Sequence, residues 1–570
     1  MRAGGDGVRG AADPLAGRCG REERTRTVRA TEMVLTTTDI ARRGPVLFGS
    51  RRGVRRTPSC RPDLRLDDAV LFGSRRGVRR TARPASLVVA AATIALGLAA
   101  AVPAEAQQTE RPDRSKRPAV GPAPELKLPP VERYTLSNGL EVLVMEKRGL
   151  PLVQVNLHVR TGSVRDPADR IGLASLTADM LDEGAAGLDA LELADRFERL
   201  GARFGVGAGA HTSTVSLRVP VARLDAGLGL MADVVLRPDF PESELERLKR
   251  ERLTAMIRRH DEPNSIASAL FRRVLFGESH PYGRIADEAS LRATTLEDIR
   301  GFYSRYYRPG NATVIVVGDI DAASARAAIE RAFGAWEGGR VERARLEPAE
   351  QVRGRVVYVV DKPGSAQSVI QIGRIGIARD SKDYYAVLVM NTILGGSFTS
   401  RLNQNLREDK GYTYGAGSYF DAGPIPGAFV ASAAVQTDAT GPALREFMKE
   451  LRAIREGVTD EEVAGARNYL AMRYPAGFQS VADIASQLAE VVQYGLPVDD
   501  LNHFTSRVLA VTRQDVERVA RTYIDPENLV IVVVGDRARI EAQIRAENLG
   551  EIRFLEVTDV FGEPPTSTEE

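Results

Sequence analysis

Residues 291–319 have the sequence LRATTLEDIRGFYSRYYRPGNATVIVVGD, and residues 508–536 have the sequence VLAVTRQDVERVARTYIDPENLVIVVVGD. The two stretches lie 217 positions apart and share ten identical residues over 29 without a gap. Each predicts a helix, a turn that contains Pro and Asn, and a buried strand (313–317 or 530–534) that ends in Gly-Asp. The chain therefore contains a duplicated unit built from both helices and strands.

A period of 217 residues is far longer than the period of a solenoid repeat. It predicts two homologous domains, at about 131–340 and 350–560. The charged stretch 337–354 shows no apolar periodicity and is the predicted connection between them. The domains account for most of the chain, which is long enough for more than one core.

Short patterns in the first half predict an α+β fold. Asn138-Gly139 predicts a β-hairpin, and the apolar alternation from Val153 to Val159 predicts a half-buried strand. Leu173, Leu176 and Met180 form one helical stripe, and Pro241 opens a longer helix rich in Glu and Arg. Strands and helices without strict βαβ alternation indicate layered α/β sandwiches.

The first 86 residues form a basic leader. VLFGSRRGVRRT occurs at 46–57 and again at 70–81, a tandem that lacks the periodicity needed for a core. A translation start placed too far upstream, with Met33 or a later start as the true one, is the favoured interpretation; a real N-terminal arm is the alternative. The chain's two cysteines, Cys19 and Cys60, both lie in this leader, so the remainder has neither a disulfide nor a cysteine ligand.

Residues 87–106 resemble a secretion signal. Arginines precede an apolar run at 87–102, and Ala104-Glu105-Ala106 forms an A-x-A cleavage site. The run is short for a membrane span, so we expect cleavage and a periplasmic or secreted protein, with an uncleaved anchor as the alternative. Residues 107–130, rich in Pro and charge, are the expected linker to the first domain.

The charge of the chain differs sharply between its leader and the remainder. Residues 1–106 carry 20 Arg and 10 acidic residues, whereas the remainder carries 58 basic and 66 acidic residues. The folded part is therefore acidic, which argues against nucleic acid as its partner.

Several stretches together resemble the insulinase/pitrilysin family, the inverzincins, over about 130–545. They are Tyr-x-Leu-x-Asn-Gly-Leu at 134–140, Gly-Ser-x-x-Asp-Pro at 162–167, Gly-Leu-Ala at 172–174, His-Pro-Tyr-Gly at 280–283, and the two Tyr-x-x-Pro-x-Asn…Gly-Asp blocks. The resemblance implies a metallopeptidase-like chain of two homologous domains that pair into a half clam-shell.

The zinc motif of that family is missing. Active members carry His-x-x-Glu-His directly after Gly-Leu-Ala, which places two ligands four residues apart on one helical face. The matching residues here are Ser175, Leu176, Thr177, Ala178 and Asp179. A third ligand, a Glu, would fall near Ala255-Met256, and neither position is Glu. We therefore expect no metal in this chain, and zinc in a partner subunit.

Other metal and hydrolase interpretations are weaker. The five histidines are His158, His211, His260, His280 and His503, and no two have helical ligand spacing. We expect His280 to be a turn residue. Asp179, Asp182 and Glu183 could attract a hard cation, but a solvated acidic helix end is the favoured interpretation. A serine hydrolase built on Ser175 and Asp179 would need a nearby base, and none is adjacent in sequence.

The second half contains LGGSFTSRL at 394–402 and LREDKGYTY at 406–414. In the family an Arg and a Tyr seven positions apart face the zinc across the chamber, and Arg407 and Tyr414 have that spacing. The resemblance implies that both bind substrate and assist catalysis. Arg401 and Tyr412 are the competing candidates. Ordinary roles are the alternative, a salt bridge from Arg407 to Glu408 or Asp409 and a packed strand tyrosine.

Two functions remain open. The chain could be the zinc-free subunit of a heterodimeric metalloendopeptidase, acting with a zinc-bearing homologous subunit on an unfolded peptide. The alternative is a catalytically inactive periplasmic homologue that binds peptides or serves as a scaffold. In either case we expect the chain to be inactive on its own.

Overall fold

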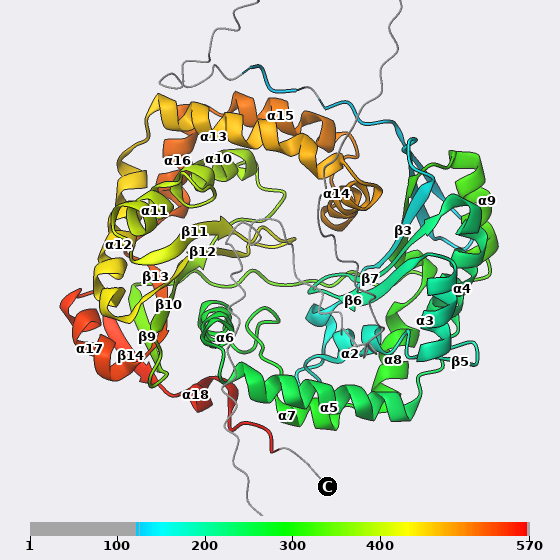
Figure 1. Ribbon diagram of the computed structural model, residues 1–570, viewed down its shortest axis with the longest axis horizontal. Coiled ribbons are helices and arrows are strands. Elements are labelled where there is room, and N and C mark those ends of the chain that lie inside the picture. Colours follow the sequence, from blue (N-terminus) through cyan, green and yellow to red (C-terminus); the bar gives the residue numbers. More distant parts are fainter. Residues whose placement is uncertain (1–120, 125, 567–570) are drawn as a thin grey trace, which may run out of the picture. The chain divides into compact units, whose positions relative to one another are not determined.

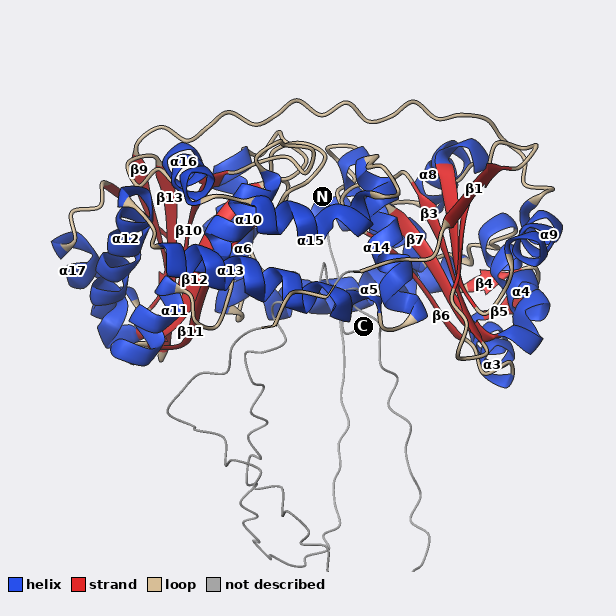
Figure 2. Ribbon diagram, turned by 90° about the horizontal axis from the view of Figure 1, so that it is seen from above, coloured by secondary structure: helices blue, strands red, loops and turns tan. Residues whose placement is uncertain are grey.

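The computed structural model describes residues 121–124 and 126–566 (Figure 1). The predictions for the leader (1–86), for the signal segment (87–106) and for most of the 107–130 linker lie outside these residues. Two six-stranded sheets, each covered by helices on both faces, make up the described part (Figure 2). The fold is α+β, as expected from the sequence. No described helix is both long and apolar enough to cross a bilayer.

The first sheet has the strand order β1-β2-β8-β3-β7-β6. Its strands are β1 (Val131–Thr135), β2 (Glu141–Glu146), β3 (Leu152–Val159), β6 (Arg203–Ala208), β7 (Ser213–Pro220) and β8 (Ala312–Gly318). Strands β2 and β8 are parallel, and the other pairs are antiparallel. The predicted hairpin is confirmed, because β1 pairs with β2 across a turn in which Gly139 has a φ of 90°.

The second sheet has the order β11-β12-β10-β13-β9-β14. Its strands are β9 (Arg355–Asp361), β10 (Gln367–Ile375), β11 (Thr413–Phe420), β12 (Ala428–Gln436), β13 (Leu529–Gly535) and β14 (Glu551–Leu555). Written from the other edge, this order places β9, β13, β10, β12 and β11 where the first sheet has β2, β8, β3, β7 and β6. The parallel pair recurs as β9 with β13. Matching strand orders show that the duplicated sequence forms a duplicated sheet.

Helices cover one face of each sheet and enclose its main core. In the first half these are α2 (Leu173–Asp179), α3 (Ala190–Arg199), α4 (Leu224–Leu236), α8 (Leu296–Tyr306) and α9 (Ala322–Phe333). In the second half they are α10 (Tyr384–Leu394), α12 (Thr440–Glu456), α13 (Asp460–Arg473), α16 (Arg513–Tyr523) and α17 (Arg537–Ala546). Further helices are α5 (Glu242–Arg259), α7 (Glu288–Ala293), α15 (Asp500–Ala510) and α18 (Val557–Phe561). Pro241 opens α5, as predicted. The short strands β4 (Gly184–Ala185) and β5 (Leu188–Asp189) form an antiparallel pair of their own.

The opposite face of each sheet is covered by a helix from the other half of the sequence. Helix α6 (Pro263–Phe276) packs on β10 and β13 of the second sheet, in a core that includes Phe271 and Val532. Helix α14 (Val481–Tyr494) packs on β3 and β8 of the first sheet, in a core that includes Leu488 and Ile315. The two halves thus exchange one helix each (Figure 1).

This exchange corrects one prediction. The alternation at 153–159 predicted a half-buried strand, yet β3 is buried at every residue after Leu152. Its polar face carries Gln154, Asn156 and His158, and α14 covers it. The polar groups bond one another locally: Gln154 donates to the Asn156 carbonyl oxygen at 2.6 Å, and Nδ1 of His158 lies 3.1 Å from the Thr214 hydroxyl. Burial lowers the pKa of His158 to about 4, so this histidine is neutral.

Candidate functional site

The segment that carries the predicted Arg/Tyr pair is fixed by a close approach between α10 and β11. Helix α10 ends at Leu394, and Gly395 follows with Ser418 of β11 against it. A Cβ on Gly395 would lie 2.3 Å from the Ser418 backbone nitrogen, so no larger residue fits. Asn391 donates to the Ser418 carbonyl at 2.9 Å and accepts from its hydroxyl at 2.7 Å. These contacts explain why a glycine follows the helix at position 395.

Arg407 lies in a π-helical turn, Gln404–Asp409, that continues the short helix α11 (Arg401–Asn403). Single π-helical turns occur frequently at functional sites. The guanidinium stacks over the ring of Phe398, with 4.6 Å between its central carbon and the ring centroid, and Phe398 is 58% exposed. The salt bridge to Glu408 that the sequence offered as an alternative is present, at 3.3 Å. A pair this open to solvent contributes little stability, and a ligand can compete for the guanidinium.

Tyr414 lies on β11, at the edge of the second sheet, and is 81% exposed. The pairing of β11 with β12 shifts between Thr413 and Ala416, where β11 contains one extra residue. The hydroxyl of Thr413 holds this bulge by donating to the Ala434 carbonyl at 2.6 Å and accepting from the Gly415 amide at 3.1 Å. Bulges at sheet edges redirect side chains. Within the described part of the chain, the Tyr414 hydroxyl has no hydrogen-bond partner.

The competing candidates are engaged elsewhere. Arg401 binds both carboxylate oxygens of Glu462, at 2.7 and 2.9 Å, and donates to the Gly457 carbonyl at 3.0 Å. Tyr412 is half-buried and packs against the core of the second half. These contacts leave the partly exposed Arg407 and the exposed Tyr414 as the less engaged pair, and their catalytic role stays a prediction.

The positions that match the zinc motif lie on α2. Asp166 holds the start of this helix by accepting from the amides of Gly172 and Ala174, both at 2.8 Å. Burial raises the pKa of Asp166 to about 6. Gly172 has a φ of 98°, a left-handed conformation that favours glycine, so the Gly-Leu-Ala stretch is explained by the geometry of the helix start.

Arg252 of α5 occupies the space between the two motif positions. Its guanidinium donates to the Ser175 hydroxyl at 3.0 Å and to the Asp179 carboxylate at 2.7 Å, and lies 3.3 Å from the Gly172 carbonyl. Arg252 was not predicted from the sequence, because the family pattern places a Glu near Ala255-Met256. The available signal was an arginine four residues earlier, on the same helical face.

The residues present here do not fit a zinc ion. A serine hydroxyl and an arginine-bound carboxylate replace the two imidazoles, and a fixed positive charge contacts both. Ser175 also donates to the Gly172 carbonyl at 3.0 Å, so its hydroxyl is engaged by Gly172 and Arg252 rather than by a base. Among the described residues, no three His, Cys, Asp or Glu side chains gather in an arrangement that could hold a metal ion.

The expectation of a solvated acidic helix end is wrong for this cluster. Asp179 pairs with Arg252, and Glu183 pairs with Arg247. Asp182 is partly buried, and burial raises its pKa to about 7, helped by the charge of Glu183. The acidic residues are therefore part of the packing between α2 and α5.

His280 is a turn residue, as expected. Its carbonyl accepts from the Gly283 amide at 2.9 Å, and its Nδ1 accepts from the Tyr282 amide at 3.1 Å. Tyr282 in turn lies 2.5 Å from Nε2 of His211, which connects the turn to the β6–β7 hairpin.

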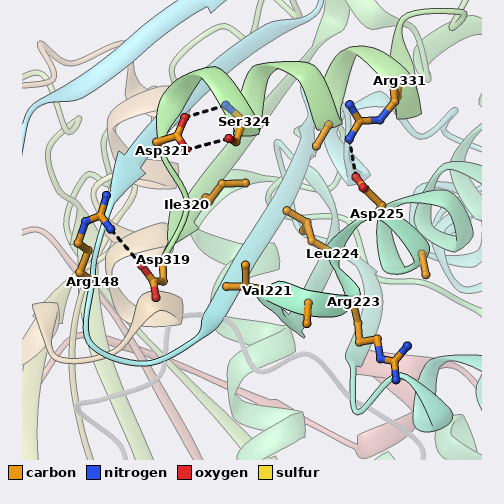
Figure 3. A pocket seen from close by; sticks show the side chains of 13 residues that line it. Arg148, Val221, Arg223, Leu224, Asp225, Asp319, Ile320, Asp321, Ser324 and Arg331 are labelled. Atoms are coloured by element: carbon orange, nitrogen blue, oxygen red, sulfur yellow. Dashed lines mark hydrogen bonds and ion pairs between the residues drawn. The ribbon is translucent and has the colours of Figure 1, made fainter.

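One hollow in the described part of the chain lies away from the predicted pair. It measures about 500 Å³ and lies between the start of α4 and the start of α9 (Figure 3). Arg331 pairs with Asp225 at 2.7 Å, and Asp321 accepts from the Ser324 amide at 2.9 Å to cap α9. A second hollow of about 380 Å³ runs beside the π-helical turn, lined by Arg401, Gln404, Asn405, Asp409, Lys410, Lys449 and Glu450.

Comparison with known proteins identifies the family. A model described as the insulinase family (peptidase family M16) matches residues 142–274, and a model described as the peptidase M16 inactive domain matches 293–470. The crystal structure of a peptidase M16 inactive domain from Pseudomonas fluorescens is 31% identical, with a TM-score of 0.67, over 71% of this chain and 98% of that one. This chain belongs to the insulinase family.

Other similar proteins are named as zinc proteases or as a protease. The zinc protease YmxG of Bacillus subtilis is 24% identical over 345 residues, which are 60% of this chain and 82% of YmxG. The zinc protease Rv2782c of Mycobacterium tuberculosis is 25% identical over 421 residues, 73% of this chain and 96% of that protein. A protease from Helicobacter pylori shares the fold, with a TM-score of 0.66 and 22% identity over 71% of this chain and 100% of that one.

Proposed function

We propose that this chain is the zinc-free subunit of a two-chain insulinase-type metalloendopeptidase. It would pair with a zinc-bearing homologous subunit and contribute to hydrolysis of an unfolded peptide in the partner's site. The supporting observation is a contrast within one chain. The zinc-motif positions are closed by Arg252, whereas Tyr414 projects from an edge strand with its hydroxyl free of partners among the described residues.

The two site residues have distinct chemical roles in this proposal. Arg407 donates from its planar fork to a carbonyl or carboxylate of the bound peptide, giving up its weak contact with Glu408. Tyr414 donates its hydroxyl proton in a hydrogen bond to the oxygen that becomes negative when the scissile carbonyl is attacked. Neither step requires a metal in this chain.

We propose further that the chain is exported and that its homologous units are 131–340 and 350–560. Export rests on the arginine-flanked apolar run at 87–102 and the following A-x-A site. The unit boundaries rest on the repeat and on the extended stretch between α9 and β9. N-terminal sequencing of the secreted protein would test the cleavage site after Ala106.

The experiment combines the full chain with a homologous subunit that carries an intact His-x-x-Glu-His motif, and measures cleavage of an unfolded peptide. We expect each subunit alone to be inactive and the mixture to be active. Arg407→Ala and Tyr414→Phe in this chain should suppress the activity of the mixture. Arg452→Ala and Tyr419→Phe, which alter an exposed arginine and another exposed tyrosine of β11, are the matched controls.

Two results would contradict the proposal. If both site variants form an active mixture, this chain contributes no catalytic group, and the peptide-binding or scaffold alternative is correct. If the chain alone cleaves the peptide, the assignment of catalysis to a partner is wrong.

A further inference from the structure

We infer that Arg252 is a built-in replacement for the metal ion of this fold, so that a side chain joins α2 to α5 where active relatives use zinc. The inference concerns the first half of the chain alone. It does not depend on the proposed partner or on the roles of Arg407 and Tyr414.

The geometry of the contacts carries the inference. The positions matched to the two ligand histidines, Ser175 and Asp179, are one helical turn apart on α2. Two different nitrogens of one guanidinium reach them, at 3.0 and 2.7 Å. A group bonded to both positions lies where a shared ligand ion would have to lie. The third contact, 3.3 Å to the Gly172 carbonyl, extends the cross-link to the start of the helix.

The chemistry explains why an arginine suits this place. A guanidinium is permanently protonated and offers several donors in one plane, so it can bind a hydroxyl and a carboxylate together. Its single charge matches the single carboxylate of Asp179. A divalent cation would have to bind beside the guanidinium, whose positive charge no accessible pH removes. The guanidinium therefore fills the site and also repels a metal ion from it.

The inference predicts a fold that is independent of metal and dependent on Arg252. The full chain should purify without stoichiometric zinc, and neither chelator nor added zinc should change its melting temperature. Arg252→Ala should lower the melting temperature by roughly 2–4 °C, because Asp179 loses its partner and the two helices lose their cross-link. Arg250→Ala, which alters an exposed residue of the same helix, should leave it unchanged.

A second set of variants keeps the test informative even if Arg252→Ala fails to fold. Arg252→Lys retains the charge without the planar fork and should melt between wild type and Arg252→Ala. With Ser175→His and Asp179→His introduced together, equilibrium dialysis should show no zinc binding while Arg252 is present. Adding Arg252→Lys should leave zinc binding undetectable, whereas adding Arg252→Gln should give an affinity at least about tenfold above the detection limit.

Three results with the wild-type chain and the single variants would overturn the inference. These are stoichiometric zinc in the wild-type chain, a lower melting temperature on chelation, or equal melting temperatures for Arg252→Ala and Arg250→Ala. A fourth result would do the same. If the double-histidine variant bound zinc equally well with Arg, Lys or Gln at position 252, the guanidinium would not occupy the ion's place.

Discussion

Tyr412 and Tyr414 are two residues apart, and on a regular strand they would face the same side of the sheet. The structure separates them, because the extra residue of β11 falls between Thr413 and Ala416. Tyr412 packs on the core while Tyr414 faces solvent. The seven-residue spacing from Arg407 could be found in the sequence, but the different exposure of the two tyrosines could not, because the bulge leaves no clear sequence signal.

The difference between the two tyrosines can be measured in the reconstituted enzyme. Tyr414→Phe removes a hydrogen bond made to the transition state, so we expect kcat to fall by roughly 100-fold with KM little changed. Tyr412→Phe should leave kcat within about twofold of wild type, because its ring packing is retained. Steady-state kinetics of both mixtures would check this. If only Tyr412→Phe lowered kcat strongly, Tyr412 would be the catalytic tyrosine in place of Tyr414.

Asp182 makes stability depend on pH. Its pKa is raised from 3.8 to about 7, so the folded chain holds a proton that the unfolded chain releases. This contribution is complete below pH 3.8 and is lost as the pH rises through about 7. The melting temperature of Asp182→Asn, minus that of wild type, should therefore increase over this range and level off above it. A flat curve for Asp182→Asn would contradict the shift.

The element scale shows how far the repeated sequence determines local structure. Thr295 and Thr512, which are equivalent in the repeat, begin α8 and α16 with the same capping box. In the second copy Thr512 accepts from the Asp515 amide at 3.1 Å, and Asp515 accepts from the Thr512 amide at 3.0 Å. The shared Thr and Asp are thus explained by helix capping, with no role in chemistry.

Removing one cap should have a modest and specific effect. Thr512→Ala is expected to lower the free energy of unfolding by about 1 kcal/mol, because the first turn of α16 loses a partner for an amide. Thr522→Ala alters a threonine near the end of the same helix, whose hydroxyl only bonds back to the Arg518 carbonyl, and should be near neutral. Denaturant titrations would compare the two. Equal losses would mean that the cap is not what these positions provide.

Helix α14 stabilises a sheet that lies far from it in sequence. Leu488 is fully buried among residues of β2 and β8. Leu488→Ala should cost about 2–5 kcal/mol and should increase hydrogen exchange in β3 and β8 more than in β10 and β13. Ser486→Ala, on the exposed side of the same helix, should change neither. Faster exchange confined to the second sheet would contradict the observed packing.

At the scale of the whole molecule, the repeat predicted two equivalent α+β units, and the structure shows two sheets with equivalent strand orders. The exchange of α6 and α14 could not be predicted, because the apolar pattern of an amphipathic helix does not specify which of the two sheets it will cover. The burial of β3 could not be predicted for the same reason. Gln154, Asn156 and His158 indicated a solvent-exposed face of the strand, whereas α14, which is distant in sequence, covers that face.

The exchange predicts that neither half folds alone. Residues 121–345 would lack the helix that covers β3 and β8, and residues 346–566 would lack the helix that covers β10 and β13. Each half expressed separately should aggregate or bind a hydrophobic dye, whereas co-expression should yield a soluble complex with native circular dichroism. A half that unfolds cooperatively by itself would contradict this.

Helices α6 and α14 begin almost one repeat period apart, so the two halves donate equivalent helices to each other. Reciprocal donation of an equivalent segment is the defining feature of a domain-swapped, two-fold symmetric homodimer. The tandem chain therefore has the architecture of such a dimer fused into one polypeptide. Because one polypeptide encodes both copies, their residues can differ: the first contains the Arg252 cross-link, and the second contains Arg407 and the exposed Tyr414.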